Sequence, residues 1–194
     1  MLAIKPYNRE RALMYARKYA FSQNPMFADF RGIGGNCTNF VSQCLFAAGC
    51  VMNYTAVYGW YYISLDDRSP SWAGVRYFYD FITKNRSVGP FGHEAEEAEC
   101  ESGDIIQLGK EEEGFYHTLL ISDIRDGEIY VTAQTDDAVD RPLSTYNYDY
   151  KRFIRVDGIR FRTEDDDGCF REIYGAVPDA ETPSSEAEKT PADG

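Results

Sequence analysis

The sequence has no apolar run long enough to span a bilayer, which takes about 20 residues in a helix. Residues 1–10 carry charges and a proline instead of the apolar centre of a signal peptide. It has no CxxC pair, and neither histidine lies at a short metal-ligand spacing from a cysteine. These absences predict a cytoplasmic protein with no membrane span, no metal and no other cofactor. An extracellular location stays open if a leader precedes this sequence.

Basic residues are scarce, since 20 Lys and Arg stand against 32 Asp and Glu, for a formal net charge of −12. Nucleic acids and anionic membranes bind clustered Lys and Arg, so we expect no nucleic-acid partner. The five cysteines are an odd number in 194 residues and do not resemble the disulfide framework of a small secreted domain. We therefore expect reduced thiols. The sequence does not define an oligomeric state.

One domain of ordinary size accounts for most of the chain. The hydrophobic fraction is 43%, with 12 Phe, 15 Tyr and 2 Trp, which is enough to bury a continuous core. Residues 178–194 are instead rich in Ala, Glu, Pro, Ser and Thr and have no large apolar side chain. We predict a single domain over residues 1–177 and a disordered acidic tail over residues 178–194.

Helical patterns come first in the chain and strand patterns follow. Apolar residues recur at helical spacing in three segments, with Asn8 as an N-cap and Gly49 as a C′ residue: 8–21, 37–48 and 72–84. Four later segments have the alternation or short apolar runs of strands: 104–108, 116–124, 128–133 and 153–161. This order predicts an α+β fold, with N-terminal helices packed on a C-terminal antiparallel sheet.

The most informative cysteine is Cys37, at the junction between a glycine-rich loop and a helix. Unpaired N–H groups and the positive end of the helix dipole favour a thiolate there, and they can also stabilise an oxyanion. The alternative is a buried, inert cysteine, which is the interpretation we give to Cys44 and Cys50.

A nucleophilic thiol needs a base, and the sequence offers two histidines. His93 lies in a loop before an acidic run and is expected on the surface. His117 begins an apolar strand close in sequence to the one that Gly103 and Asp104 open, so a hairpin-like frame would hold it against the helix start. Asp104 is predicted to bind backbone amides in a turn. A core histidine with a structural role is the alternative for His117.

The segment GNCTNFVSQCL, residues 35–45, resembles the signature of the bacterial putative amidase domain family, of the amidase 6 type. That family is usually placed near the CHAP and NlpC/P60 papain-like hydrolases. The resemblance covers residues 7–150. It extends to four further segments and one histidine: residues 7–20, 59–62, 71–72, 103–107 and His117.

The resemblance implies a papain-like fold and an acyl-enzyme mechanism with Cys37 and His117, without a metal. It also implies amide substrates such as cell-wall peptides. The residue before the nucleophile is commonly Asp in such motifs, and here it is Asn36. Relatives often place a histidine where this chain has Gln134. Gln134 could still orient the imidazole, as an asparagine does in papain-like sites, and Asp136 is the alternative; an exposed strand end is the structural alternative for Gln134.

Three functions remain open from the sequence. The first is a cysteine amidase or peptidase with Cys37, His117 and Gln134 as catalytic residues. The second is a papain-like binding module without catalysis, whose groove would take peptides or glycans. The third is acyl transfer to an amine through the same acyl-enzyme. In each case we predict Asn36, Trp60 and Trp72 as substrate-binding residues, with burial in the core as the alternative for the two tryptophans.

Overall fold

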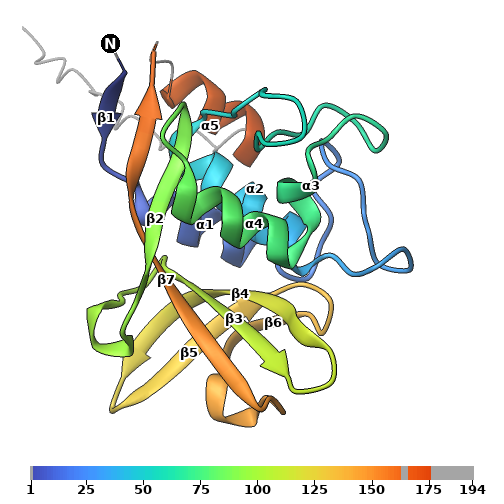
Figure 1. Cartoon of the computed structure of the whole chain (residues 1–194), viewed down its shortest axis with the longest axis vertical. Helices are drawn as coiled ribbons and strands as arrows, with labels where there is room; N and C mark the ends of the chain where they lie inside the picture. The colour runs from blue at the N-terminus through green and yellow to red at the C-terminus, as the bar shows by residue number, and fades with distance from the viewer. Residues whose placement is uncertain (1, 163–165, 176–194) are drawn as a thin grey trace, which may run out of the picture.

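The computed structural model describes residues 2–162 and 166–175, with the side chains of 166 and 167 left out. It is an α+β fold of helices and an antiparallel sheet (Figure 1). The helices are α1 (Arg9–Tyr19), α2 (Cys37–Gly49), α3 (Pro70–Ala73), α4 (Val75–Lys84) and α5 (Asp166–Tyr174). The strands are β1 (Ala3–Lys5), β2 (Gly89–Ala95), β3 (Ile105–Lys110), β4 (Gly114–Arg125), β5 (Glu128–Ala133), β6 (Ala138–Pro142) and β7 (Tyr150–Phe161).

The strands form a seven-stranded sheet in the order β1-β7-β3-β4-β5-β6, and β2 also pairs with β7. The long strand β7 connects the two parts of the molecule. Its residues 150–154 pair with β3, and its residues 159–161 pair with β1. In Figure 1, β7 runs from beside the helices down into the curled part of the sheet formed by β3 to β6.

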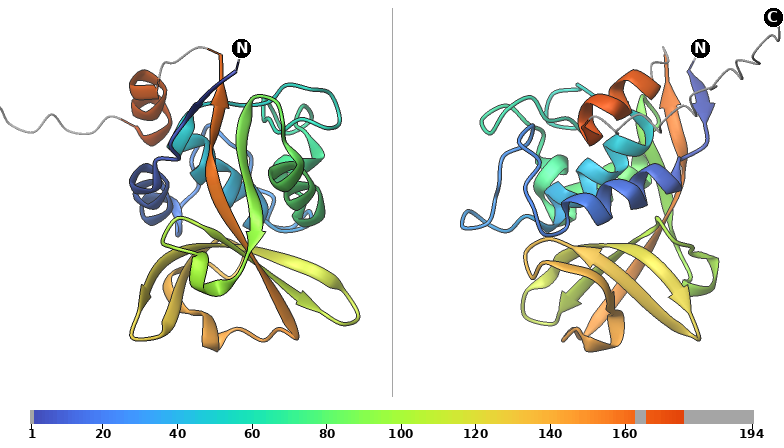
Figure 2. Two further views of the ribbon diagram at one scale, coloured as in Figure 1. Left: turned by 60° about the vertical axis from the view of Figure 1, so that its left-hand side comes forward. Right: turned by 180° about the vertical axis from the view of Figure 1, so that it is seen from behind.

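Helix α2 lies at the centre of the helical half, between α1, α3, α5 and the sheet (Figure 2). Twelve of its 13 residues are buried. The packing is close at its C-terminal end, where a Cβ on Gly49 would lie 1.8 Å from Cδ1 of Ile159. Any larger residue at position 49 would therefore require the Ile159 side chain to move or α2 to shift from β7.

The buried apolar residues form two clusters on opposite faces of the sheet. The helix-side core joins the helices to the sheet and includes Phe40, Leu45, Trp60, Trp72, Ile105, Leu120 and Ile154. The sheet-side core fills the curled part and includes Ile106, Leu108, Leu119, Ile121, Val131 and Phe153. Neighbouring residues of one strand, such as Leu119 and Leu120, belong to different clusters because side chains alternate along a strand.

The predicted elements are present, although most of their bounds are shifted and one predicted helix is divided in two. Asn8 caps α1 by accepting a hydrogen bond from the Arg11 N–H, and β5 has the predicted bounds. The predicted helix 72–84 is two helices, because Gly74 takes an extended conformation between them. Gly49 is the last residue of α2, and Cys50 takes the left-handed conformation (φ 53°) that we had assigned to Gly49.

The prediction missed β1, β2, β6 and α5. Strand β2 contains two glycines and a proline, which are unfavourable for a strand, and it forms through pairing with β7. Asp104 has the predicted structural role, since its carboxylate accepts hydrogen bonds from Glu101 N, Val156 N and the Arg9 guanidinium. The predicted tail, 178–194, lies outside the described residues. Among the helices described, none is long and apolar enough to cross a membrane.

The expectation that all five cysteines are reduced is wrong, because Cys50 and Cys169 form a disulfide. The bond joins the residue after α2 to α5 across 119 positions of sequence. Cys50 is therefore not an inert apolar residue as predicted. Cys37, Cys44 and Cys100 are free thiols, and all three are buried.

We predict that replacing Cys169 by Ser lowers the free energy of unfolding by about 2–4 kcal/mol, because the bond closes a long loop and restricts the unfolded chain. Urea unfolding of the oxidised wild-type and variant proteins measures the difference. Dithiothreitol should destabilise the wild type and leave Cys169→Ser unchanged. Equal sensitivity of the two proteins to the reductant would argue against this bond.

Candidate functional site

Cys37 is the first residue of α2 and follows a loop of three glycines with positive φ. Gly32, Gly34 and Gly35 have φ of 99°, 127° and 97°, a region that L side chains rarely adopt. The loop can therefore turn sharply into the helix. The Cys37 residue is only 6% exposed, so the thiol lies just beneath the surface of the helix start.

The surroundings of the Cys37 thiol act on its pKa in opposite directions. Burial raises the pKa, and this effect is the larger one. Hydrogen bonds from the backbone of Thr118, and from the side chain and backbone of Thr38, lower it. The Thr38 hydroxyl oxygen lies 3.9 Å from Sγ. The net result is a protonated thiol at neutral pH in this conformation.

The start of α2 meets strand β4 through Thr118, whereas the sequence predicted that His117 would lie against the helix start. The hydroxyls of Thr38 and Thr118 lie 2.9 Å apart although the residues are 80 positions apart in sequence. Gln107 donates to the same Thr118 hydroxyl at 3.1 Å and accepts from the Arg152 guanidinium at 2.9 Å. This buried polar chain fixes the helix start against β3 and β4.

His117 lies next to Thr118 on β4, but its side chain leaves the other face of the strand. Thr118 points to α2, so strand alternation directs His117 toward the sheet-side core. The imidazole lies between the rings of Tyr116 and Tyr146, each with its centroid 6.0 Å away. Its Nε2 is buried and has no hydrogen-bond partner in the part of the chain that the structure describes. The thiol and the imidazole are therefore not hydrogen-bonded in this conformation.

Burial lowers the pKa of His117 to about 4. Two charges modify this effect: Asp136 raises the pKa and Arg141 lowers it. Asp136 is thus the carboxylate whose charge acts on the imidazole. It lies in the turn between β5 and β6, where Thr135 and Asp136 both have positive φ (72° and 69°).

The structure does not place Gln134 against His117. Its carboxamide nitrogen donates to the backbone oxygens of Tyr19 and Ser22 at 2.6 and 3.1 Å, and its oxygen accepts from the side chain of Asn36. All of these bonds lead to α1 and the loop before Cys37. The predicted role of Gln134 in orienting the imidazole is therefore not supported, and neither is an exposed strand end, since Gln134 is buried.

Asn36 also has a structural role in this conformation and is not accessible to a substrate, which corrects its predicted place among the substrate-binding residues. It is fully buried, and its side-chain oxygen accepts from the backbone N–H of Phe30 at 3.0 Å and the side chain of Asn39 at 2.8 Å. The two positions at which this chain departs from the family motif, 36 and 134, thus contact one another. One hydrogen bond joins these two neutral carboxamides, with the Asn36 nitrogen as donor and the Gln134 oxygen as acceptor.

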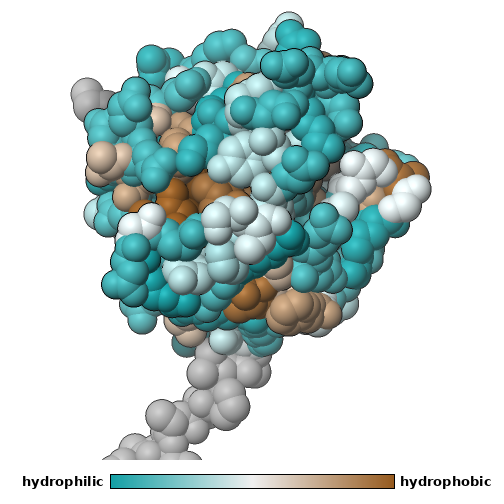
Figure 3. All heavy atoms as spheres, turned by 90° about the horizontal axis from the view of Figure 1, so that it is seen from below, coloured by the Kyte–Doolittle hydropathy of each residue, from teal (hydrophilic) through white to brown (hydrophobic). Residues whose placement is uncertain are grey.

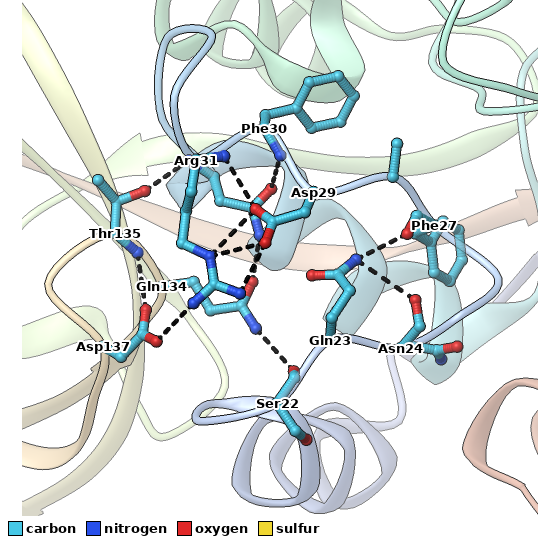
Figure 4. A network of polar contacts seen from close by, with 12 residues as sticks. Ser22, Gln23, Asn24, Phe27, Asp29, Phe30, Arg31, Gln134, Thr135 and Asp137 are labelled. Atoms are coloured by element: carbon cyan, nitrogen blue, oxygen red, sulfur yellow. Dashed lines mark hydrogen bonds and ion pairs between the residues drawn. The ribbon is translucent and has the colours of Figure 1, made fainter.

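The turn at 134–137 braces the loop that precedes Cys37 (Figure 4). The hydroxyl of Thr135 accepts from the backbone N–H of Asn36 at 2.5 Å. Arg31 bridges Asp29 and Asp137, with nitrogen–oxygen distances of 2.7 and 2.9 Å. These contacts hold the loop that leads to Cys37 against the end of β5.

Trp60 and Trp72 are fully buried, which corrects their predicted place in a substrate groove. Their indole N–H groups donate to polar side chains of α2: Trp60 to Ser42 at 3.0 Å and Trp72 to Asn39 at 2.7 Å. The sequence contained a signal for this. Polar residues in a helix that is buried on every side need partners, and indole N–H groups are donors only.

His93 has the predicted surface position, with half of its side chain exposed and Nδ1 2.8 Å from the Asp157 carboxylate. Gln43 is buried and accepts a 2.7 Å hydrogen bond from Tyr15. Neither residue joins the site.

Comparison with known proteins identifies relatives. A family model described as "Putative amidase domain" matches residues 6–156. The chain is 33% identical over 137 residues to the uncharacterized protein YhbB of Bacillus subtilis (strain 168). That alignment covers 68% of this chain and 42% of YhbB, so the chain spans less than half of that relative's length. No solved structure matches this chain.

The low pKa of His117 makes stability depend on pH. The unfolded histidine takes up a proton near its ordinary pKa of 6.5, whereas the folded one does so near 4, so acid favours the unfolded state between these values. We expect the free energy of unfolding to fall by roughly 3 kcal/mol from about pH 7 to pH 4 through this residue. Denaturant unfolding of wild type and His117→Asn across this range measures the contribution.

The surface histidine provides the control, because His93→Asn changes the same residue type at an exposed position. His93→Asn should keep the wild-type loss of stability in acid, and His117→Asn should lose part of it. An NMR titration of His117 with a midpoint near 6.5 would contradict the expected burial effect.

Proposed function

The chain belongs to the family described as "Putative amidase domain", and we propose that it is an amide hydrolase. In this proposal it cleaves amides through a thiol, with Cys37 as nucleophile and His117 as base. The observation that carries the proposal is the contact between the start of α2 and strand β4. It brings Cys37 next to the residue that follows His117, although the two segments are distant in sequence. We further propose that the fold is papain-like, since it combines a cysteine at a helix start with a histidine on an antiparallel strand.

The reaction requires the imidazole to move from its place beside Tyr146 to the α2 side of β4. This takes a change in the backbone at His117, because side-chain rotation alone does not exchange the two faces of a strand. Its unpartnered Nε2 supports this step, because no hydrogen bond in the described chain would have to break at that atom. His117 then takes the thiol proton, and the sulfur attacks the amide carbon. The C–N bond breaks, and the imidazolium gives its proton to the leaving amine.

Water then completes the cycle. His117 accepts a proton from the water, which attacks the thioester carbon, and the released thiol recovers its proton. The first N–H groups of α2, which have no partner within the helix, are suited to stabilise the oxyanion in both steps. An amine acceptor in place of water would give transfer by the same route.

We propose Asp136, rather than Gln134, as the residue that stabilises the charged imidazole. The support is electrostatic, since the Asp136 charge raises the pKa of His117. Gln134 and Asn36 instead brace the loop that carries the nucleophile. The end of β5 and the turn after it would thus serve the active site in two ways. The charge of Asp136 acts on the imidazole, and Gln134 supports the loop before Cys37.

The substrate that we propose is a peptide amide, with bacterial cell-wall peptides as the first class to test. The support is the family description, together with the resemblance of residues 35–45 to the signature of that family, which implies amide substrates such as cell-wall peptides. YhbB is uncharacterized and much longer than the matched segment, so it adds no substrate.

A binding module without catalysis is the second candidate, and a specific observation favours it. The thiol is buried and protonated, and the imidazole is not bonded to it. Such a module would not use Trp60 and Trp72 as its groove, because both are buried. Turnover that depends on Cys37 separates the two candidates.

The Cys50–Cys169 disulfide bears on the compartment. Such bonds persist in oxidising surroundings and are rare in a reducing cytosol. We therefore propose that the protein works in an oxidising compartment, in place of the cytoplasmic location expected from the sequence. A mass spectrum of protein isolated under alkylating conditions from its natural source would show whether this bond exists there.

We predict that iodoacetamide modifies Cys37 faster than Cys100 at about pH 7. Cys100 is the matched control, since it is also a free buried thiol and is slightly more exposed, at 9% against 6%. Burial raises the pKa of Cys100 to about 11, and no imidazole is expected to activate it. Peptide mapping by mass spectrometry gives both rates.

Cys37→Ala should remove amide hydrolysis by at least about 1,000-fold, and Cys100→Ser should keep it. The measurement is release of amine from peptide amides, with the folded state of each variant checked by its unfolding transition. Labelling of Cys100 before Cys37, together with hydrolysis that survives in Cys37→Ala, would refute the thiol mechanism.

A further inference from the structure

Two neighbouring cavities lie on the side of the molecule that carries α3 and α4. The first, of about 380 Å³, is lined by Gly34 and Gly35, which precede Cys37, and by Pro70 and Gly74. The second, of about 550 Å³, lies between the loop at 53–58 and α4. Tyr77 lines both cavities. In Figure 1 the loops that follow α1 and α2 extend on the same side as α3, which agrees with this arrangement.

The wall of the second cavity is fixed by main-chain contacts. Asn53 and Trp60 exchange backbone hydrogen bonds of 2.9 and 2.8 Å. Gly59 is required between them, since a Cβ there would lie 2.1 Å from the Asn53 carbonyl oxygen. The indole of Trp60 is in turn bound to α2. The wall of the second cavity therefore has a conformation defined by hydrogen bonds and close packing.

Aromatic rings are exposed where the cavities meet and along the second cavity. Tyr77 is 58% exposed and Tyr58 is 84% exposed. Large apolar surfaces left open beside a cavity commonly mark binding sites. Seen from below, the surface is mostly hydrophilic, with apolar side chains in a small hollow and a few patches (Figure 3).

Cations gather at the far end of the second cavity, although the chain carries a net charge of −12. Lys84 and Arg86 line it, and Arg160 donates to the backbone oxygen of Asn85 between them at 2.9 Å. Burial is the main cause that lowers the pKa of Arg160. The positive charge of Arg86 lowers it further, and Asp157 raises it.

The acidic residue that lines this cavity, Asp80, is already paired with Lys84. Arg86 forms no ion pair with any residue that the structure describes. The cavity thus presents a guanidinium that is open to an anion, and Arg binds carboxylates in a planar, two-bonded geometry.

From this arrangement we infer that the two cavities form one groove for an extended acidic peptide. Its backbone leads from the loop before Cys37 across Tyr77, and its carboxylate binds Lys84 and Arg86. Tyr77 and Lys84 are seven residues apart on α4, which is roughly 10 Å, or about three extended peptide residues. This inference rests on the proposed function, which places the scissile amide at Cys37.

The experiment measures binding without turnover, in the Cys37→Ala protein. Two fluorescent peptides of about six residues are compared by anisotropy, one with glutamate at both ends and one with glutamine at both ends. The glutamate peptide should bind about fivefold more tightly or better at low salt, and the advantage should shrink at about 0.5 M salt. Glutamate at both ends tests the groove in either direction of the peptide.

The double variant Lys84→Gln and Arg86→Gln, in the same Cys37→Ala background, should lose the preference for glutamate. Arg125→Gln is the control, because Arg125 is on β4, is half exposed, pairs with Asp123 and lines neither cavity. Equal affinity for both peptides, or the same loss in Arg125→Gln, would overturn the inference.

The two proposals can fail separately. A wild-type protein that hydrolyses no amide but prefers the glutamate peptide refutes the proposed function and keeps the acidic groove. A protein that hydrolyses amides through Cys37 and binds both peptides equally keeps the function and refutes the groove.

Discussion

The burial of α2 on all sides is the constraint on which the rest of the structure depends. A helix so enclosed cannot leave polar groups to water, yet α2 carries Thr38, Asn39, Ser42 and Gln43. Each unmet polar group would cost about 1–3 kcal/mol, so each needs a partner in a surrounding element. The partners come from β4, from the two tryptophans and from α1. The carboxamide nitrogen of Gln43 is the exception, since it has no partner in the described part of the chain. The polar residues of the CTNFVSQ motif, residues 37–43, therefore determine which elements pack against the central helix and where.

The same constraint explains why the nucleophile and the fold share one motif. Thr38 is bound to β4 because it is buried, and that bond brings Cys37 to the strand that carries His117. Gln107 and Arg152 extend the contact across β3 to β7. A change at Thr38 or Thr118 would thus disturb the stability of the domain and the geometry of the site together. At this end of α2 the Thr38–Thr118 contact both positions Cys37 and stabilises the fold.

Residue patterns predicted the local elements and failed where partners distant in sequence decide the outcome. The 3.6-residue periodicity identified α1 and α2, and alternation identified β3, β4, β5 and β7. Strand β2 was missed because its glycines and proline favour a loop until β7 pairs with it. Trp60 and Trp72 resembled groove residues because nothing in their own segments reveals that α2 supplies acceptors for their N–H groups. The pairing of Cys50 with Cys169 likewise depends on the docking of α5, which spacing cannot reveal.

Burial also determines the charge state from which any chemistry here must start. It raises the pKa of the Cys37 thiol and lowers that of His117 to about 4, so both groups are neutral near pH 7 in this conformation. A thiolate–imidazolium pair would be costly in such a dry setting unless further groups stabilised it. The helix start is suited to stabilise the thiolate and Asp136 the imidazolium, since the Asp136 charge already acts on the imidazole in its place beside Tyr146. The Arg31–Asp137 bridge and the Asn36–Gln134 contact hold the loop that leads to the thiol. In an enzyme built this way, the ion pair would form only when the imidazole reaches the helix start, so the conformation of β4 around His117 would control when the thiol reacts.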